Sequence, residues 1–390
     1  MPRSDRSLNL APASVRDYRE LARRRLPRQM FDYIDGGAYE ESTLRANVDD
    51  LAAIKLRQRV LRDVSDLSLA TTVLGEELSM PVVLAPVGLA GMFATRAEVQ
   101  AAKAAEAAGV RFCESTVSIA GIEEVAAATS QPFWFQLYVM RDRSYAEGLM
   151  ARAQAAGCSV LVLTVDLAVV GARYRDTRNA MVGEISKLAA ARRGLDLVTH
   201  PGWVRDVAIG GKPHTFGNLL DAVPGGTSPA DFRDWVDAQF DPSVTWEDLA
   251  WVREHWQGTI VLKGVLDPDD ARAAADAGVD GLVVSNHGGR QLDDTPSTVA
   301  ALPAIVDAVG DRLDVLVDGG IRSGLDVVKC IALGAKACLL GRAWAWAVAA
   351  EGQAGVEHVL QVVREEMEVA MSLTGAPTLA DLDPEVLLRG

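Results

Sequence analysis

The chain of 390 residues is 49% hydrophobic and 24% charged, which supplies enough apolar material for a large core and excludes a disordered protein. Its net charge of −14 at pH 7 excludes a general affinity for nucleic acid, because phosphate binding needs a basic surface. Cys113, Cys158, Cys330 and Cys338 are far apart and have apolar neighbours, so we expect core thiols in a reducing cytoplasm. No apolar run of about 18 residues occurs, and no membrane span is expected.

Residues 1–80 are predicted to form an N-terminal helical cap, after which short β-branched apolar runs alternate with Ala-rich helical segments. Eight strands are predicted, at 81–86, 110–114, 133–138, 159–166, 259–263, 280–286, 313–318 and 336–341. Continuous apolar runs are typical of parallel strands buried on both faces. We therefore predict one α/β domain, a (β/α)₈ TIM barrel over 81–345 followed by C-terminal helices over 346–390.

A long insert is predicted after the fourth strand, over residues 167–250, because a βα loop usually has only a few residues. Between positions 171 and 214, eight Lys and Arg residues occur with four Asp and Glu residues in this otherwise acidic chain. The apolar residues interleaved with them are Met181, Ile185, Leu188, Leu195, Leu197, Trp203 and Val204. This mixture favours peripheral contact of 171–215 with an anionic membrane surface, while a solvated or oligomer-packed lid over the active site fits equally well.

Polar residues follow the predicted strands, where a TIM barrel carries its reactive groups. DGGIR at 318–322 and LGR at 340–342 predict phosphate binding after the last two strands, although two tight turns containing Arg are the structural alternative. Lys263 ends an apolar strand and needs an anionic partner, either a cofactor ring or a neighbouring carboxylate. No G-x-G fingerprint, P-loop or metal-ligand spacing occurs, so neither a dinucleotide site nor a metal site is predicted.

His287 follows the sixth predicted strand within SNHGGRQ, and histidine is a natural general base near neutral pH. Asp166, at the end of the fourth strand, is suited to orient the imidazole and to stabilise its charged form. The planar guanidinium of Arg290 suits a substrate carboxylate. A structural histidine is the alternative, but these three groups at strand ends favour catalysis.

Five motifs carry a resemblance to a known family: SNHGGRQLD at 285–293, DGGIR at 318–322, LGRA at 340–343, FQLY at 135–138 and LTVD at 163–166. In these motifs, and nearly from end to end, the chain resembles the FMN-dependent 2-hydroxy acid dehydrogenases and oxidases. The segments FDYIDGGAYEESTLRANVDDL, LSMPVVLAPVGLAGM and QAGVEHVLQVVREEMEVAMSLTGA are most similar to the respiratory L-lactate dehydrogenase branch.

The resemblance implies FMN as cofactor and oxidation of a small L-2-hydroxy acid, with L-lactate as the expected substrate. His287 would act as the base and Asp166 would stabilise the imidazolium, while Arg173, Arg290, Tyr33 and Tyr138 would bind the substrate. The residues implied for FMN are Pro86, Gly88, Ser115, Gln136, Thr164, Lys263, Asp318, Gly320, Arg322, Gly341 and Arg342, the last five at the ribityl chain and phosphate. The sequence does not decide whether His287 removes the Cα proton or the hydroxyl proton during hydride transfer.

Gly88 occupies a position where oxidase members typically carry Ala, which favours a quinone or cytochrome over oxygen as electron acceptor. A homotetramer is expected, located in the cytoplasm and peripheral on the inner face of the cell membrane. The alternatives are an oxygen-using 2-hydroxy acid oxidase, a mandelate dehydrogenase and, in another class, the FMN-containing isopentenyl diphosphate isomerase. The paired Arg173 and Arg290 argue against the isomerase. The preference for a substrate side chain depends on residues such as Val117 and Val170 and is not predicted.

Overall fold

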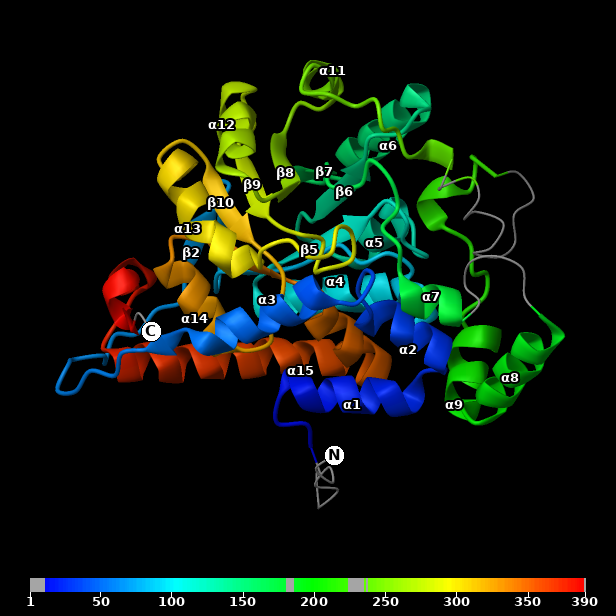
Figure 1. Cartoon of the computed structure of the whole chain (residues 1–390), viewed down its shortest axis with the longest axis horizontal. Coiled ribbons are helices and arrows are strands. Elements are labelled where there is room, and N and C mark those ends of the chain that lie inside the picture. The colour runs from blue at the N-terminus through cyan, green and yellow to red at the C-terminus, as the bar shows by residue number, and fades with distance from the viewer. Residues whose placement is uncertain (1–10, 180–185, 224–234, 236–237, 389–390) are drawn as a thin grey trace.

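Eight parallel strands close into a barrel in the computed structural model, which describes residues 11–179, 186–223, 235 and 238–388. In chain order they are β4 (Val82–Leu84), β5 (Arg111–Ser115), β6 (Trp134–Tyr138), β7 (Val160–Thr164), β8 (Thr259–Val265), β9 (Gly281–Val284), β10 (Asp314–Val317) and β11 (Ala337–Leu340). Neighbours in this order are hydrogen-bonded, and β11 pairs with β4 to close the barrel. Each strand overlaps one predicted apolar run, so the predicted TIM barrel is confirmed (Figure 1).

The barrel interior is a closed apolar cluster that includes Trp134 and Leu316. An antiparallel hairpin of β2 (Thr71–Val73) and β3 (Glu76–Leu78) covers its N-terminal end, where Val73 and Leu78 join the same cluster. Glu76 fixes this hairpin, because its carboxylate accepts a hydrogen bond at 3.2 Å from the indole N–H of Trp134. With the bottom of the barrel closed in this way, the carboxyl ends of the strands remain for a ligand.

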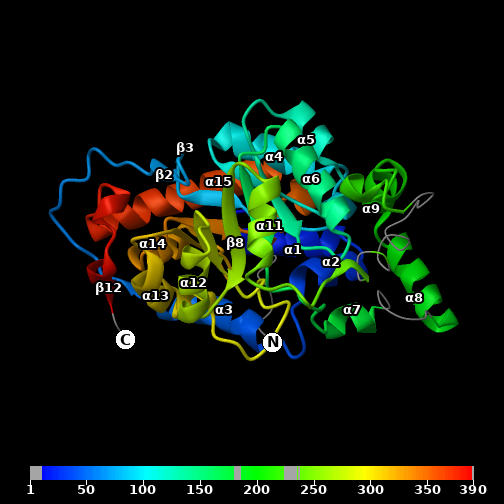
Figure 2. The same cartoon turned by 90° about the horizontal axis from the view of Figure 1, so that it is seen from above.

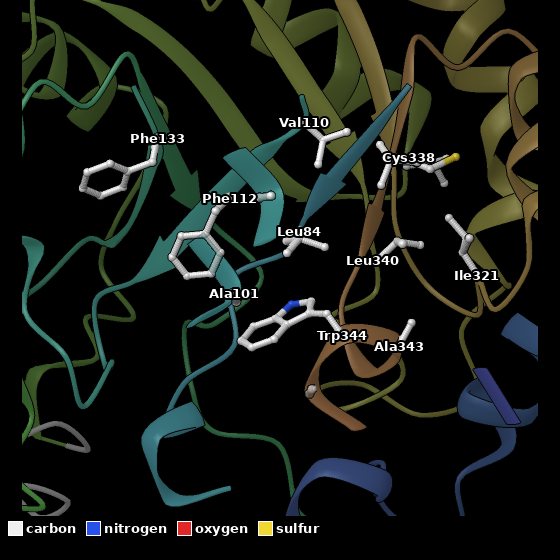
Figure 3. Packing of buried hydrophobic residues seen from close by; sticks show 14 of the residues in the cluster. Leu84, Ala101, Val110, Phe112, Phe133, Ile321, Cys338, Leu340, Ala343 and Trp344 are labelled. Atoms are coloured by element: carbon white, nitrogen blue, oxygen red, sulfur yellow. The ribbon is translucent and has the colours of Figure 1, made fainter. Parts of the chain in front are cut away.

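Outward-facing strand residues pack against the surrounding helices, as Figure 3 shows around Trp344. The Trp344 ring meets Phe112 edge to face, with 6.0 Å between ring centroids, and its indole N–H donates to the Ala85 carbonyl at 3.0 Å.

The predicted core thiols are confirmed, because all four cysteines are buried and free.

The barrel helices are α4 (Ala97–Ala108), α5 (Ile122–Ala128), α6 (Arg143–Ala155), α11 (Asp248–His255), α12 (Pro268–Asp276), α13 (Thr298–Val309), α14 (Gly324–Ala332) and α15 (Arg342–Thr374). Helix α4 ends at Gly109, whose φ of +68° is the left-handed conformation that stops a helix. Helix α15 crosses the predicted boundary at residue 345 and bends at Glu351 and Gly352. The chain then forms η4 (Leu379–Asp381), η5 (Pro384–Val386) and β12 (Leu387–Leu388), which pairs with β1 (Lys55–Leu56).

Three helices precede the barrel: α1 (Val15–Arg25), α2 (Arg28–Asp35) and α3 (Ser42–Ala53). Helix α1 lies along α15, as Figure 1 shows. The rest of the described N-terminal segment, up to residue 80, consists of turns, loops and the short strands β1, β2 and β3, so helices form only part of the predicted cap. The short turn η1 (Ala90–Met92) follows β4.

The insert after β7 contains α7 (Tyr174–Arg178), α8 (Lys187–Val198), α9 (Pro201–Trp203), the π-helical turn η2 (Val204–Ile209) and η3 (Gly217–Leu219). Trp203, which was expected on a surface that contacts lipid, is only 6% exposed and donates its indole N–H to the Met92 carbonyl at 2.9 Å. That expectation was wrong for Trp203, which packs against the loop after β4, whereas Leu188 and Leu195 of the same insert are exposed. Met181 and Ile185 lie outside the described residues.

Helix α3 receives its N-terminal cap from the loop after β9. Its own N-cap residue, Glu41, makes no capping hydrogen bond with its side chain. Instead, the Asp293 carboxylate accepts the backbone N–H groups of Ser42 at 3.2 Å and Thr43 at 2.8 Å. Partial burial raises the pKa of Asp293, but these hydrogen bonds outweigh burial and lower the pKa to about 2.

We expect Asp293→Ala to lower the free energy of unfolding by about 0.5–2 kcal/mol at neutral pH, as loss of a helix cap does. Because the folded-state pKa is depressed, this stabilisation is complete above the ordinary value of 3.8 and is lost as the pH falls toward 2. Urea unfolding of both proteins at neutral pH and below pH 3.8 measures the difference. Asp311→Ala, at an exposed turn, is the control. Equal stabilities of the Asp293 variant and the wild type at neutral pH would contradict the capping role.

Candidate active site

A cavity of about 450 Å³ opens at the carboxyl ends of the barrel strands, and every strand or its following loop contributes to the lining. Helix α2 contributes Met30, Tyr33 and Ile34. The site residues predicted from the sequence that line it are Tyr33, Pro86, Gly88, Ser115, Gln136, Tyr138, Thr164, Arg173, Lys263, His287, Arg290, Asp318, Gly320, Arg322, Gly341 and Arg342. Asp166 is the one predicted residue outside the lining, and it contacts the cavity through His287.

His287 and Asp166 form a close pair, with 2.9 Å between Nδ1 and the Asp166 Oδ1 atom. Because Nδ1 is engaged, Nε2 is the ring nitrogen left for a substrate. Burial raises the pKa of Asp166, but His287 and Lys263 outweigh burial and hold the pKa below 3.8. The ionised carboxylate stabilises the imidazolium that forms when His287 accepts a proton.

A bulge in β8 makes room for this pair. Gly264 has a φ of +111°, and the register of β8 against β9 shifts between Lys263 and Val265. A Cβ atom at Gly264 would lie 2.6 Å from the Asp166 Cβ atom, so no other residue fits beside the carboxylate without displacing it.

Two guanidinium groups make cation–π contacts with the Tyr33 ring. Arg290 lies 5.0 Å and Arg173 lies 5.5 Å from the ring centroid. Arg290 also donates to the backbone carbonyls of Tyr33 at 2.7 Å and Gly36 at 3.0 Å. Burial lowers the pKa of Arg290, and the charge of Arg173 lowers it further. Two cations held this close favour an anionic ligand such as a carboxylate between them.

A second pair of arginines lines the cavity after β10 and β11, and Arg342 of this pair donates to the same Gly36 carbonyl as Arg290. Burial lowers the pKa of Arg322 to about 10, and burial together with Arg290 and Arg322 lowers the pKa of Arg342. Next to them, a Cβ atom at Gly320 would overlap the Asn47 carbonyl oxygen at 1.9 Å, so the backbone there comes into contact with α3. Two desolvated cations beside glycine-rich turns favour a phosphate group.

The cavity is also lined by polar groups that can donate hydrogen bonds and by groups that can accept them. Lys263 Nζ lies 3.2 Å from an Asp318 carboxylate oxygen and donates to Ser285 Oγ at 3.0 Å, so the neighbouring-carboxylate alternative for Lys263 is realised. Within the part of the chain that the structure describes, Gln136 Nε2 and Asp318 Oδ1 are buried without a hydrogen-bond partner. Buried polar atoms without partners are costly, so they favour a polar ligand in the cavity.

Comparison with known proteins assigns the chain to a family. The sequence profile of the FMN-dependent dehydrogenases matches residues 22–389. The chain belongs to this family. An L-lactate dehydrogenase of Caulobacter sp. (strain K31) is 57% identical over 377 residues, which cover 97% of this chain and 98% of that protein. The structure of the monotopic membrane protein (S)-mandelate dehydrogenase matches with a TM-score of 0.92 and 36% identity over 97% of this chain and 100% of that chain. A mandelate oxidase structure matches with a TM-score of 0.82 and 37% identity over 97% and 98% of the two chains.

FMN is the cofactor of this dehydrogenase family, and the cavity fits it. Gln136 Nε2 would supply a donor for a flavin ring edge, and Asp318 Oδ1 would supply an acceptor for a ribityl hydroxyl group. Arg322 and Arg342 would hold the phosphate, and Lys263 would face the electron-rich edge of the ring. We therefore propose that the residues assigned to FMN from the sequence bind it in this cavity.

A buried pair of asparagine side chains, which the sequence prediction missed, supports the two turns that carry His287 and Gly320 in this dehydrogenase. Asn286 and Asn47 exchange two side-chain hydrogen bonds, at 2.8 and 2.9 Å, and both side chains are buried. Asn286 lies next to His287, and the Asn47 carbonyl contacts Gly320. Asn286 stands in the SNHGGRQ motif, but Asn47 had no signal because it lies in α3, far away in the sequence.

We expect His287→Gln to retain FMN but to lower the rate of flavin reduction by at least roughly 10²- to 10⁴-fold, the usual effect of losing a general base. Stopped-flow absorbance under anaerobic conditions measures this rate. His255→Gln on α11, outside the cavity lining, is the control. Reduction of the His287 variant at the wild-type rate would rule out the role as a base.

Proposed function

We propose that this FMN-dependent dehydrogenase oxidises an L-2-hydroxy acid, and specifically L-lactate to pyruvate. The observation that carries the proposal is the His287–Asp166 pair, 2.9 Å apart, in the same cavity as the two guanidinium groups that share the Tyr33 ring. The arginine pair suits the carboxylate of a 2-hydroxy acid, and the base suits a proton on the adjacent carbon or on its hydroxyl group.

In this mechanism Arg173 and Arg290 bind the substrate carboxylate and orient the reacting carbon toward His287. His287 Nε2 takes one proton from the substrate, and Asp166 stabilises the resulting imidazolium. Bound FMN supplies the acceptor for the two electrons that leave the substrate. Burial raises the pKa of Tyr138 well above its ordinary value, so its hydroxyl group stays protonated and can donate to the substrate. Removal of the Cα proton and removal of the hydroxyl proton both use these groups.

One relative is named for lactate, a small acid, and another is named for mandelate, which carries a larger phenyl group. In this chain Val117, Tyr138 and Phe240 form a wall shared between the cavity and a much smaller hollow beyond it. The Phe240 ring packs edge to face on Tyr138, with 5.6 Å between centroids. This wall limits the space available to a substrate side chain and favours a small acid such as lactate over mandelate.

The test of this proposal is anaerobic bleaching of the flavin by a panel of enantiopure 2-hydroxy acids. We expect L-lactate to bleach it fastest, D-lactate to leave it oxidised and (S)-mandelate to react slowly, because the wall excludes a phenyl ring. The ratio of kcat/KM values gives the preference. A protein that none of the acids bleaches would disprove the proposal, and faster bleaching by mandelate would replace lactate as the substrate.

We propose that the electrons leave to a quinone or cytochrome instead of oxygen. Gly88 supports this assignment, because the oxidases that the chain resembles typically carry Ala there. A Cβ atom at Gly88 would lie 2.6 Å from Val117 Cγ2, so glycine lets this β-branched side chain pack closely beside the flavin position. The expected homotetramer remains a prediction.

We expect Gly88→Ala to displace Val117, to slow reduction by L-lactate and to raise the rate of flavin reoxidation by oxygen relative to that by a quinone analogue. The double variant with Val117→Ala should recover lactate reduction, because it removes the clash. Gly148→Ala in α6, where an added Cβ meets no atom within 4 Å, is the control. If oxygen reactivity stays unchanged in Gly88→Ala, Gly88 gives no support to the choice of acceptor.

We also propose that α8 contacts an anionic membrane surface. None of its side chains is buried, and Leu188, Leu195 and Val198 are 63%, 67% and 75% exposed. Figure 2 shows α8 at the edge of the molecule, away from the barrel strands. Arg193 of the same helix lines the cavity, so α8 lies next to the site. Among the described residues, no helix has the length and apolarity to cross a bilayer.

We expect the protein to sediment with anionic vesicles at low salt and to be released as salt rises, because cations attracted to a charged surface are screened within a Debye length. Leu188→Ser with Leu195→Ser should weaken this binding while turnover with a soluble acceptor is retained. Val369→Ser on α15, where the side chain is 58% exposed, is the control. Failure of the intact protein to sediment at low salt would leave the solvated lid as the interpretation of α8.

A further inference from the structure

The proposed base, its carboxylate partner and the two arginines assigned to the substrate come from two separate loops. The β7 loop, residues 165–173, carries Asp166 and Arg173, whereas the β9 loop, residues 285–293, carries His287 and Arg290. The two arginines repel each other, because the charge of Arg173 lowers the pKa of Arg290. The Asp166–His287 pair joins the two loops close to the strand ends, and a second contact joins them closer to the two arginines.

One side-chain amide of the β9 loop spans this junction. Gln291 Nε2 donates to the backbone carbonyls of Asp166 and Val169, each at 2.9 Å. Gln291 Oε1 accepts the backbone N–H of Gly171 at 3.0 Å. The amide nitrogen and the amide oxygen of Gln291 thus both bind the backbone of the β7 loop. The three bonded residues lie between Asp166 and Arg173 in the sequence or include Asp166 itself.

The backbones of the two loops also touch at Gly171. A Cβ atom there would lie 2.6 Å from the Arg290 carbonyl oxygen and 2.7 Å from the Gln291 carbonyl oxygen. Backbone oxygens cannot move aside as the end of a flexible side chain can. A side chain at position 171 would therefore push the β7 loop away from the β9 loop.

We propose that Gln291 is a positioning residue for the oxidation: its amide clamps the β7 loop to the β9 loop and thereby brings Asp166 to His287 and Arg173 to Arg290. This inference rests on the proposed function. The amide is required, because a carboxylate at this position would turn two favourable contacts with carbonyl oxygens into repulsion. Gln291 also lines the cavity, so the clamp lies beside the reacting groups.

The test uses the FMN-loaded enzyme with Gln291→Glu and Gln291→Met, which keep the length of the side chain. We expect both to retain FMN and the wild-type unfolding midpoint, and to reduce flavin roughly 10- to 100-fold more slowly with L-lactate, because small misplacements of catalytic groups have effects of this size. Oxalate, a probe for the paired arginines, should bind more weakly in a flavin absorbance titration. If Gln291→Glu loses FMN, Gln291→Met carries the test.

A second pair of variants tests the clamp from the other loop. Gly171→Ala should slow reduction as Gln291→Met does, and the double variant should lose less than the product of the two single losses, because both changes break one contact. Gln257→Glu, an exposed glutamine beyond α11, should match the wild type. A wild-type rate and wild-type oxalate affinity in Gln291→Met, or fully multiplicative losses in the double variant, would overturn the proposal.

The oxalate titration separates this inference from the proposed function. If no hydroxy acid reduces the wild-type flavin, the proposed function fails, yet oxalate binding still reports on whether Gln291 aligns Arg173 with Arg290. If L-lactate reduces the wild type but Gln291→Met behaves identically in both measurements, only the clamp fails.

Discussion

The repulsion among partly buried cations is the constraint on which the site depends. Arg173, Arg290, Arg322 and Arg342 line one cavity, and the pKa values of Arg290 and Arg342 are lowered by burial and by neighbouring arginines. The C-terminal end of α2 offsets part of this cost. Its backbone carbonyls accept hydrogen bonds from Arg290 and Arg342, and such helix-end carbonyls carry partial negative charge. Helix α2 is therefore an electrostatic part of the barrel site, and the remaining positive charge favours the phosphate of FMN and the carboxylate of a substrate.

The catalytic loop after β9 is held in a conformation that few residues adopt. His287, Gly288 and Gly289 all have positive φ values, which for the histidine is a strained backbone. The surrounding hydrogen bonds fix this turn: Ser285 Oγ accepts the His287 N–H at 3.1 Å, and Asn286 is paired with Asn47. The strained turn is therefore the backbone conformation in which the His287 imidazole contacts Asp166.

The insert joins the cavity to the surface through α8. Arg193 lines the cavity, while Asp196 accepts the Arg28 N–H at 2.8 Å and so fixes α8 to the start of α2. The helix that offsets the charge of the arginine cluster thus also anchors the exposed helix proposed to contact the membrane. Among the described residues of α8, none is hydrogen-bonded to the His287–Asp166 pair, so α8 is joined to the site through α2 and the cavity wall.

By itself the sequence determined the barrel and most of the site, because both leave local signals: apolar runs mark each buried strand, and polar residues follow each run. Only the tertiary structure decided which distant segments support that site. Asn47 and Asp293 act across about 240 residues of chain, and nothing in the spacing of a motif encodes such contacts. Trp203 shows the same limit for surfaces: an apolar stripe mixed with basic residues has the same pattern whether it packs on protein or lipid. Which of the two it meets depends on where the insert folds back, and that is set by packing between elements rather than by local sequence.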